Sequence, residues 1–273
     1  MGTFAVTGVA SGLGAATAQS LRADGHDVIG IDRRDCRDAD ITADLATPAG
    51  RQAAIDGVGE ASGGKLDGAA MFAGLGGATG RPASLLVSVN YFGTVELLEA
   101  FRPLLAAAGE SSAVAISSNA ATCQPGWRLE LAQACLSGDE TRALAVADEG
   151  DSATAYPATK LAIARWVRRH APTAEWAGAG IRLNAVAPGL IETPFVAQTR
   201  SDPVLGPLIG AFPLPLGRGG TAEEIAALVS FLLGPQARFF CGSVLFCDGG
   251  TDALLRSEDW PARWDLSARK DPD

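Results

Sequence analysis

The sequence predicts an α/β protein, built as one doubly wound parallel sheet of about seven strands with helices on both faces. Two observations lead to this fold class. Short apolar runs alternate with longer helical stretches along most of the chain, which is typical of parallel strands joined by crossover helices. No linker, repeat or change of composition divides the 273 residues. We therefore expect a single domain over residues 1–250, followed by a C-terminal tail at residues 251–273.

The individual elements follow from these runs in chain order. Strands are expected at residues 3–7, 27–32, 68–72, 113–117, 182–187 and 243–247, all short and apolar, as in a sheet covered on both faces. Helices are expected at residues 13–22, 48–58, 85–107, 155–169 and 222–233. Pro48 suits the first turn of the second helix. Two long segments, residues 122–152 and 190–220, interrupt the alternation at the carboxyl ends of strands, where a parallel sheet binds its ligands.

Composition excludes several classes of protein. Hydrophobic residues make up 47% of the chain and the mean hydropathy is +0.16, which supplies a core and excludes a disordered chain. The longest apolar runs are shorter than the roughly 18–20 residues that cross a bilayer, so no membrane partner is expected. A net charge of −9 at pH 7 disfavours contact with a phosphate backbone, so no nucleic acid is expected either.

The cysteines and histidines are too few and too scattered for a metal site. The five cysteines form no C-x-x-C pair, and only His26 and His170 are present, both expected at the surface. A Ser-His-Asp hydrolase is therefore disfavoured. Widely spaced free thiols are typical of a reducing compartment, so we expect a cytoplasmic protein without bound metal. The first residues lead directly into a structural motif, so no secretory leader is expected.

Glycines at the end of the first strand form the strongest local signal. The motif Thr7-Gly8-Val9-Ala10-Ser11-Gly12-Leu13-Gly14 follows a strand and opens a helix. Its glycines permit a tight turn and a close backbone approach, while the first N–H groups of the helix attract a pyrophosphate. Asp32 ends the second strand eighteen positions after Gly14, close to the ~20 of a dinucleotide fingerprint. We therefore expect a Rossmann-type domain that binds a dinucleotide through Gly8, Ser11, Gly12, Leu13 and Gly14.

The end of the second strand also bears on which dinucleotide binds. The Asp32 carboxylate accepts hydrogen bonds from the hydroxyls of an adenosine ribose, whereas it repels a 2′-phosphate. Ser11 stands where a basic residue would help to hold that phosphate. Arg33 and Arg34 follow Asp32 directly and are able to supply such a charge. The sequence favours NAD, with NADP as the less favoured cofactor.

A tyrosine and a lysine four residues apart form the second signal. Tyr156 and Lys160 share one face of an expected helix, about 6 Å apart along its axis. A nearby ammonium favours the phenolate and lowers the pKa of a tyrosine toward a range usable for proton transfer. A surface pair without function is the simpler interpretation. However, only three of the 22 basic residues are lysine, and the chain has two tyrosines. Because ammonium and guanidinium are not interchangeable beside ribose hydroxyls, we expect both residues to be functional.

Together these motifs resemble the short-chain dehydrogenases/reductases, from residue 3 to about residue 250. The resemblance implies a catalytic tetrad completed by Asn90, in Ser88-Val-Asn-Tyr-Phe-Gly93, and by Ser118, the second serine of Ile116-Ser-Ser-Asn119. It implies that Tyr156 is the acid/base, Ser118 hydrogen-bonds the substrate oxygen, Lys160 anchors the ribose and Asn90 positions a water. Further implied cofactor contacts are Asp44, Leu45, Ala73, Gly74, Pro188, Gly189, Ile191 and Thr193.

Two departures point to one branch of that family. The usual Asn-Asn-Ala-Gly after the fourth strand reads Met71-Phe72-Ala73-Gly74, and 38 residues separate Ser118 from Tyr156. The long interval resembles the bacterial 3α-hydroxysteroid dehydrogenase/carbonyl reductases, with the coniferyl-alcohol dehydrogenases close by. The implied activity is hydride transfer between NAD(H) and a secondary alcohol or ketone with a bulky hydrophobic body, such as a 3-hydroxysteroid, a 3-ketosteroid or a cyclic ketone.

Several alternatives stay open. One alternative substrate class is aryl or allylic alcohols of the coniferyl type. An alternative from a different class of function is a dinucleotide-binding regulator that performs no catalysis.

The resemblance implies a homodimer or homotetramer. We expect the apolar face of residues 122–152 to close mainly over the substrate, with part of it at a subunit interface. The tail, with Trp260 and Trp264, matches nothing in the family. Residues expected to line the substrate pocket are Leu129, Leu136, Phe195, Val196 and Leu208.

Overall fold

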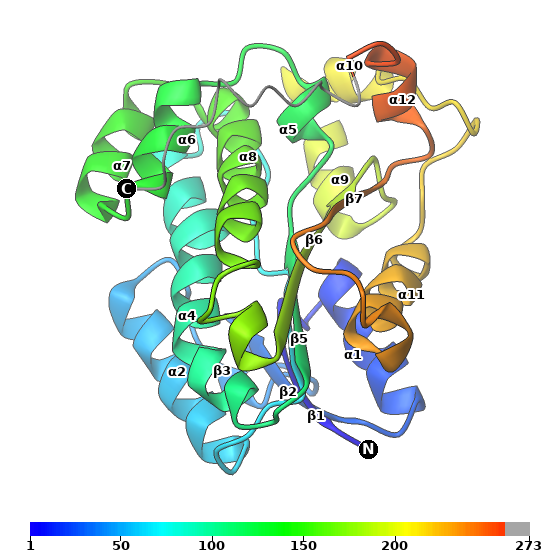
Figure 1. The fold of residues 1–273 in the computed structure, drawn as a ribbon. Coiled ribbons are helices and arrows are strands. Elements are labelled where there is room, and N and C mark those ends of the chain that lie inside the picture. The colour runs from blue at the N-terminus through cyan, green and yellow to red at the C-terminus, as the bar shows by residue number, and fades with distance from the viewer. Residues whose placement is uncertain (260–273) are drawn as a thin grey trace, which may run out of the picture.

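The computed structural model describes residues 1–259, which form a parallel sheet of seven strands between two layers of helices (Figure 1). The strands are β1 (Thr3–Thr7), β2 (Asp27–Asp32), β3 (Ile41–Thr42), β4 (Gly68–Met71), β5 (Ser111–Ile116), β6 (Ile181–Pro188) and β7 (Val244–Cys247). Their order is β3-β2-β1-β4-β5-β6-β7, and every neighbouring pair of these strands is parallel. The predicted fold class is confirmed.

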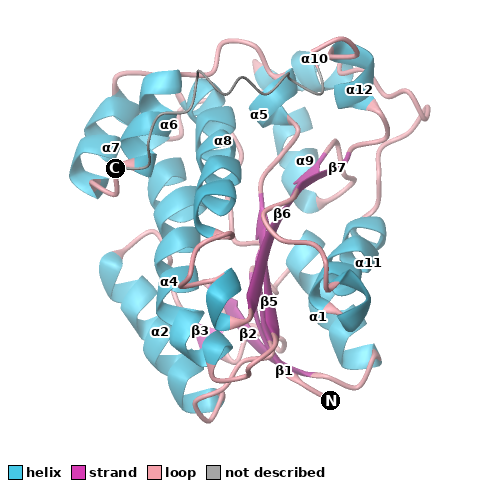
Figure 2. Ribbon diagram, in the orientation of Figure 1, coloured by secondary structure: helices cyan, strands magenta, loops and turns pink. Residues whose placement is uncertain are grey.

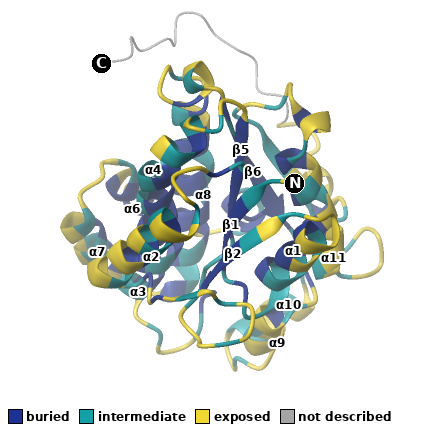
Figure 3. Cartoon of the chain, turned by 90° about the horizontal axis from the view of Figure 1, so that it is seen from below, coloured by how far each residue is buried: buried dark blue, intermediate teal, exposed yellow. Residues whose placement is uncertain are grey.

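Alternating side chains along the central strands divide the interior into two cores. In β1, Phe4 and Val6 pack in the core beneath α1 (Gly12–Ala23) and α11 (Ala222–Leu233), whereas Ala5 packs in the other core. This alternation is the period of two that a strand imposes on its side chains. The second layer holds α2 (Pro48–Ala61), α4 (Gly93–Ala106) and α8 (Ser152–His170) (Figure 2). The central strands are buried between the layers, while exposed residues lie on outer helix faces and loops (Figure 3).

The strand order changes direction between β1 and β4. The helix that follows β1 is α1, on one face of the sheet, whereas the helical run after β4 leads to α4, on the other face. Adjacent strands whose helices diverge leave a crevice at their carboxyl ends, and ligands of open α/β sheets bind there. The glycine motif after β1 and the loop after β4 therefore border the same crevice.

The helix predicted at residues 85–107 contains an irregular stretch. It consists of α3 (Ala83–Leu86), a π-helical stretch η1 (Val87–Phe92) and α4. Asn90 lies in this stretch, where its amide oxygen accepts from the Leu75 N–H at 2.7 Å and its amide nitrogen donates to the Leu75 carbonyl at 2.9 Å. A π-helical turn within an α-helix frequently occurs at a functional site. The sequence does not show this irregularity, because nearly all residues of η1 are buried. Without an exposed polar face, the hydrophobic pattern does not reveal that the helical period changes.

The long segment between Ser118 and Tyr156 folds into three short helices, α5 (Ala120–Cys123), α6 (Leu129–Leu136) and α7 (Glu140–Asp148). Helix α6 packs against α8, and α7 packs against α3 and η1. Leu131 and Ala143, on these helices, are fully buried in the core that also contains α4 and α8. Much of the apolar face of the segment is therefore covered within the chain, while Leu129 is 41% exposed. These contacts do not support the expectation that it closes mainly over the substrate.

The chain remains packed beyond residue 250. Thr251 is fully buried at the start of α12 (Thr251–Leu255), and the Asp252 carboxylate accepts from Thr122 Oγ1 at 2.6 Å and from Arg256 at 3.1 Å. Trp260 and Trp264 of the expected tail lie outside the described residues. The remaining short helices are η2 (Ala177–Ala179), α9 (Pro194–Arg200), α10 (Leu205–Gly210) and η3 (Pro235–Ala237). Within the described part of the chain, no helix is long and apolar enough to cross a membrane.

A buried arginine links three helices and leads to a stability prediction. Arg51 on α2 is 2% exposed, and its guanidinium lies 2.6 Å from the Glu96 carboxylate on α4 and 2.5 Å from the Glu140 carboxylate on α7. Breaking a fully buried pair costs about 3–5 kcal/mol, and the partial exposure of both carboxylates reduces the loss. We expect Arg51→Met to lower the free energy of unfolding in urea by about 2 kcal/mol.

The exposed pair between Arg102 and Glu99 on α4 provides the control. The two groups lie 3.2 Å apart, and the side chains of Arg102 and Glu99 are 35% and 42% exposed. Arg102→Met should therefore change the free energy of unfolding by less than about 1 kcal/mol. Equal losses in Arg51→Met and Arg102→Met would show that the buried link does not stabilise the contact between α2, α4 and α7.

Candidate active site

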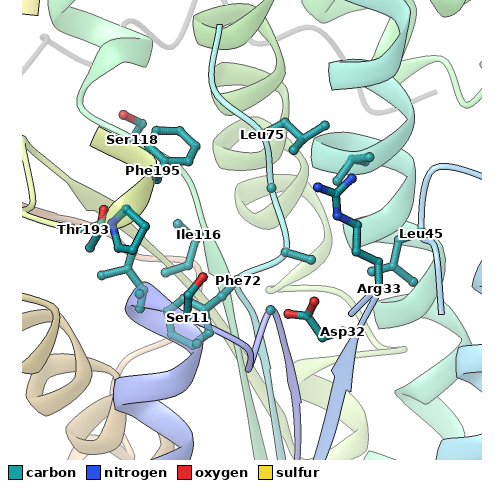
Figure 4. A pocket seen from close by; sticks show the side chains of 18 of the residues that line it. Ser11, Asp32, Arg33, Leu45, Phe72, Leu75, Ile116, Ser118, Thr193 and Phe195 are labelled. Atoms are coloured by element: carbon teal, nitrogen blue, oxygen red, sulfur yellow. The ribbon is translucent and has the colours of Figure 1, made fainter. Parts of the chain in front are cut away.

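A cleft opens along the carboxyl edge of the sheet, above the crevice between β1 and β4. Its walls come from the loops after β1, β2, β3, β4, β5 and β6, together with residues of α3, η1, α8 and α9 (Figure 4). Every residue that the sequence assigned to dinucleotide binding lines it. These residues are Gly8, Ser11, Gly12, Leu13, Gly14, Asp32, Arg33, Asp44, Leu45, Ala73, Gly74, Tyr156, Lys160, Pro188, Gly189, Ile191 and Thr193.

Backbone contacts exclude side chains from the glycine motif after β1. Gly8 and Gly12 adopt φ angles of +76° and +59°, in the region that favours glycine. At Gly14, a Cβ atom would lie 2.3 Å from the Gly8 carbonyl oxygen, so only glycine fits. The Ser11 side chain makes no capping bond to α1, which leaves the first N–H groups of that helix, with their partial positive charge, for an anion at the cleft. This cradle fits a pyrophosphate.

One end of the cleft carries a carboxylate flanked by two arginines. Asp32 accepts hydrogen bonds from the Ala10 N–H and the Arg34 N–H, both at 3.0 Å, which hold its carboxylate at the wall. The Arg34 guanidinium donates to Ser11 Oγ at 2.9 Å and lies 3.7 Å from the Asp32 carboxylate. Arg33 projects from the same strand end (Figure 4). This end fits an adenosine ribose whose hydroxyls donate to Asp32.

The other end brings together three residues that the sequence expects to be catalytic. Ser118 follows β5, and Tyr156 and Lys160 lie one turn apart on α8. Lys160 Nζ is 5.8 Å from the centroid of the Tyr156 ring and donates to the Ile116 carbonyl at 2.9 Å. A second bond, from Ser117 Oγ to the Lys160 carbonyl at 2.8 Å, also ties α8 to the end of β5. The two bonds fix the lysine beside the strand end.

Burial controls the charge of both ionisable groups at this end. Lys160 is 6% exposed, and the loss of hydration lowers its pKa from 10.5 to about 8. Burial raises the pKa of Tyr156 above its ordinary value of 10, while a hydrogen bond with Ser118 acts in the opposite direction. The expected net lowering of the Tyr156 pKa is therefore not found in this structure, because desolvation of the phenolate is the largest effect on it.

Asn90, the fourth predicted member of the tetrad, does not line the cleft. It is fully buried, and its side chain bonds to the backbone of Leu75. Gly74 lies between Asn90 and Lys160, because a Cβ atom at Gly74 would be 3.3 Å from Asn90 Oδ1 and 3.7 Å from Lys160 Nζ. The asparagine thus contacts the loop after β4 from behind, while the lysine approaches it from the cleft.

The expected substrate contacts are only partly at the cleft. Phe195 and Val196 line it, whereas Leu129, Leu136 and Leu208 do not. Leu208 is 64% exposed on α10, since helical spacing alone does not tell which apolar residue turns inward. Lining residues that the sequence missed include Phe72, Leu75, Leu85, Val89, Ile116 and Ser117. Phe72, Ile116 and Ser117 lie at the carboxyl ends of predicted strands, and that position was the signal available. Within residues 1–259, no cluster of histidine, cysteine, aspartate or glutamate side chains is suited to hold a metal.

Two family models match the chain. The model described as "short chain dehydrogenase" matches residues 3–128, and the model described as "Enoyl-(Acyl carrier protein) reductase" matches residues 141–252. The 3-alpha-hydroxysteroid dehydrogenase/carbonyl reductase of Comamonas testosteroni is 40% identical over 94% of this chain and 98% of its own. The coniferyl-alcohol dehydrogenase of a Pseudomonas species is 32% identical over 90% of this chain and 94% of its own.

Solved structures agree with these relatives. The 3-alpha-hydroxysteroid dehydrogenase from Pseudomonas sp. B-0831, a complex with NADH, has a TM-score of 0.89 and 46% identity, covering 94% of this chain and 99% of its own. The aldohexose dehydrogenase of Thermoplasma acidophilum has a TM-score of 0.72 at 24% identity, covering 92% of this chain and 93% of its own, and shows a common fold only.

The lowered pKa of Lys160 predicts a pH dependence of stability. Because its pKa in the folded chain, about 8, lies below the ordinary value of 10.5, the unfolded chain binds more protons between these pH values. The contribution of Lys160 to stability therefore rises as the pH rises through this window. We expect the free energy of unfolding of wild type minus that of Lys160→Met to increase by about 3 kcal/mol from pH 8 to pH 10.5.

Urea unfolding at a series of pH values measures this difference. Lys65→Met is the control, because the Lys65 side chain is 53% exposed, and its difference from wild type should stay nearly flat over the same window. A flat difference for Lys160→Met as well would mean that the buried lysine keeps an ordinary pKa.

Proposed function

This chain belongs to the short-chain dehydrogenase/reductase family, and from that premise we propose that it is an NAD(H)-dependent oxidoreductase that interconverts a secondary alcohol and a ketone. One observation carries the proposal. Ser118, Tyr156 and Lys160 stand at one end of a cleft whose other end combines Asp32 with the N-terminus of α1. Enzymes of this family act on hydroxyl and carbonyl groups with a nicotinamide dinucleotide, which needs both ends of such a cleft.

The proposed chemistry assigns proton transfer to Tyr156. Its raised pKa keeps the phenol protonated at neutral pH, so Oη donates a proton to a ketone oxygen. Ser118 Oγ donates a hydrogen bond to the same oxygen and stabilises the negative charge that develops on it. A nicotinamide dinucleotide bound in the cleft would supply the hydride for the carbonyl carbon in this direction and would accept it in the other. A proton and a hydride together convert the ketone to the alcohol.

Lys160 and Asn90 support that proton transfer. The Lys160 ammonium donates to the nicotinamide ribose and, 5.8 Å from the Tyr156 ring, favours loss of the phenolic proton. In alcohol oxidation, Tyr156 instead takes the alcohol proton, so higher pH favours oxidation and lower pH favours reduction. Asn90 holds the loop beside Gly74, next to Lys160 Nζ. We assign it the positioning of a water that relays the proton toward Lys160.

NAD is the proposed cofactor rather than NADP. The Asp32 carboxylate faces the end of the cleft where the 2′-position of an adenosine ribose would lie, and two backbone N–H groups hold it there. A 2′-phosphate would meet this charge at close range. Arg34 is engaged by Ser11 and Asp32, which reduces its capacity to bind a phosphate. The similarity to a structure that contains NADH supports the same choice.

The proposed substrate is a bulky hydrophobic alcohol or ketone, such as a 3-hydroxysteroid, a 3-ketosteroid or a cyclic ketone. Phe195 presents an apolar ring whose centroid lies 6.0 Å from that of Tyr156, and Leu75 and Val196 also line the cleft. The 40% identical relative is named for hydroxysteroids. The likeness to a coniferyl-alcohol dehydrogenase makes aryl and allylic alcohols the second candidate class. Absorbance of NADH, followed with a panel of steroids, cyclic ketones and aryl alcohols, separates the two classes. A dinucleotide-binding regulator would turn over none of them.

We propose further that the protein acts in the cytoplasm as a homodimer or homotetramer. The cysteines are all free thiols in the structure, as in a reducing compartment. Strand β7 is an edge of the sheet, and Phe246 on it and Phe231 on α11 are each about 40% exposed. An exposed apolar edge of this kind favours association with a second subunit.

Replacing Tyr156 by phenylalanine tests the proposed acid/base. The ring of Tyr156→Phe still packs, but no proton can move, so kcat should fall by about 10²–10⁴-fold while the Kd for NADH, measured by fluorescence, stays nearly unchanged. Tyr91→Phe is a matched control, because Tyr91 is the second tyrosine of the chain and is buried in η1 away from the cleft. If Tyr156→Phe keeps more than about a tenth of the wild-type kcat, the assignment is wrong.

Replacing Asp32 tests the choice of nucleotide. Asp32→Ala removes both the ribose acceptor and the repulsive charge, so NAD should bind more weakly by about 1.5–3 kcal/mol and discrimination against NADP should shrink. Asp32→Asn separates the two effects, because it keeps a hydrogen-bond acceptor without the charge. Titration of each variant with NADH and NADPH measures both. An unchanged preference for NAD in Asp32→Ala would contradict the role of Asp32.

A further inference from the structure

Three side chains hold the loop that follows β4 in place, and each of them forms two hydrogen bonds with it. Asn90 bonds the N–H and the carbonyl of Leu75, and Ser152 Oγ bonds the N–H and the carbonyl of Ala78 at 3.0 and 2.8 Å. The third side chain is Asp202, which accepts hydrogen bonds from the Thr79 N–H at 2.6 Å and from Thr79 Oγ1 at 2.9 Å. The loop from Phe72 to Pro82 is therefore held from three directions.

Asp202 differs from Asn90 and Ser152 in the segment of the chain to which it belongs. Asn90 and Ser152 belong to buried helical runs of the main core and are at most 3% exposed. Asp202 lies between α9 and α10, in the irregular segment that also carries Thr193 and Phe195 on the cleft. The bond between Thr79 and Asp202 thus connects two walls of the cleft that the sequence separates by 123 residues.

Phe195 spans the gap between these two walls. Its ring centroid lies 6.0 Å from that of Tyr156, and Figure 4 shows the ring beside Ser118. On its other side the ring contacts the loop after β4, because a Cβ atom at Gly76 would lie 2.8 Å from the tip of the ring. The ring therefore rests on the glycine backbone, three residues before Thr79, and borders the reacting groups.

We propose that Asp202 is a specificity-determining positioning residue, which holds α9 against the loop after β4 and thereby fixes Phe195 as the wall that a bulky substrate contacts. This inference rests on the proposed function, since it concerns which ketones the same site accepts. Asp202 touches neither the substrate nor Tyr156. It acts through Thr79 and through the segment that carries Phe195.

The Asp202 carboxylate is suited to hold the two segments together because it accepts hydrogen bonds both from Thr79 and from the start of α10. Besides the two bonds from Thr79, it accepts from the Val204 N–H at 2.9 Å and the Leu205 N–H at 3.0 Å, at the start of α10. These four donors hold the pKa of Asp202 far below its usual range. The group therefore stays charged at working pH and keeps its hold on both segments.

Two variants separate the contact with Thr79 from the capping of α10. Asp202→Ser keeps a hydroxyl acceptor for the start of α10 but is too short to reach Thr79, whereas Thr79→Val removes only the hydroxyl donor. The matched control is Asp139→Ser, because Asp139 accepts from the Arg142 N–H at the start of α7, away from the cleft. The double variant should behave like Asp202→Ser, since the two changes remove the same contact.

Steady-state kinetics and hydrogen exchange test the proposal together. In Asp202→Ser we expect KM for a fused-ring ketone to rise about fivefold, because the contact with Thr79 is charged but exposed. KM for a small cyclic ketone and the Kd for NADH should change less than about twofold. Thr79→Val should show a smaller rise of the same selectivity. Amide exchange in α9 should become faster in both variants and remain unchanged in Asp139→Ser.

Each outcome bears on a different part of the inference. Unchanged exchange in α9 would overturn the link between the two walls. Faster exchange with equal changes of KM for both ketones would overturn the role in specificity. Exchange is measured without substrate, so it still reports on the link if the wild-type protein reduces neither ketone. That last result would instead contradict the proposed function.

Discussion

Two neighbouring parallel strands, β1 and β4, send their helices to opposite faces of the sheet, and the position of the whole site depends on this divergence. The crevice that it leaves lies at the carboxyl ends of the strands, so every loop that leaves that edge is able to contribute to one cleft. The glycine motif, Asp32, the loop after β4 and Ser118 all leave from there. Residues separated by more than a hundred positions thereby share a wall.

The exclusion of water near the end of β5 shifts the pKa values of Tyr156 and Lys160. Lys160 and Tyr156 both shift toward their neutral forms, because each is removed from water and neither is fully compensated by the other. The bonds of Lys160 Nζ to Ile116 and of Ser117 to the Lys160 backbone hold α8 in this position. A protonated phenol beside Ser118 is suited to donate a hydrogen bond to a carbonyl oxygen.

The end of β4 and the start of the loop after it are the apolar residues Met71 and Phe72, and the loop is held by side chains from other segments. Thr7 Oγ1 accepts from the N–H groups of Phe72 and Ala73, both at 2.9 Å. The rest of the loop is held in the same way by further side chains. One of them, Ser152, ends the long segment after Ser118, which thus supports the site through this loop.

The sequence by itself determined the class of fold, the dinucleotide cradle and the Tyr156-Lys160 pair, because these depend on local period and spacing. The helix predicted at residues 222–233 has those bounds in the structure. Gly8 and Gly12 adopt positive φ angles where the turn was expected, and Gly14 lies in the first turn of α1. Only the tertiary structure decided that Asn90 lies behind the cleft, that the apolar face of residues 122–152 packs on α8 and η1, and that the Tyr156 pKa rises. Each of these depends on which distant segments exclude water from a side chain, and helical or strand periodicity carries no information about that.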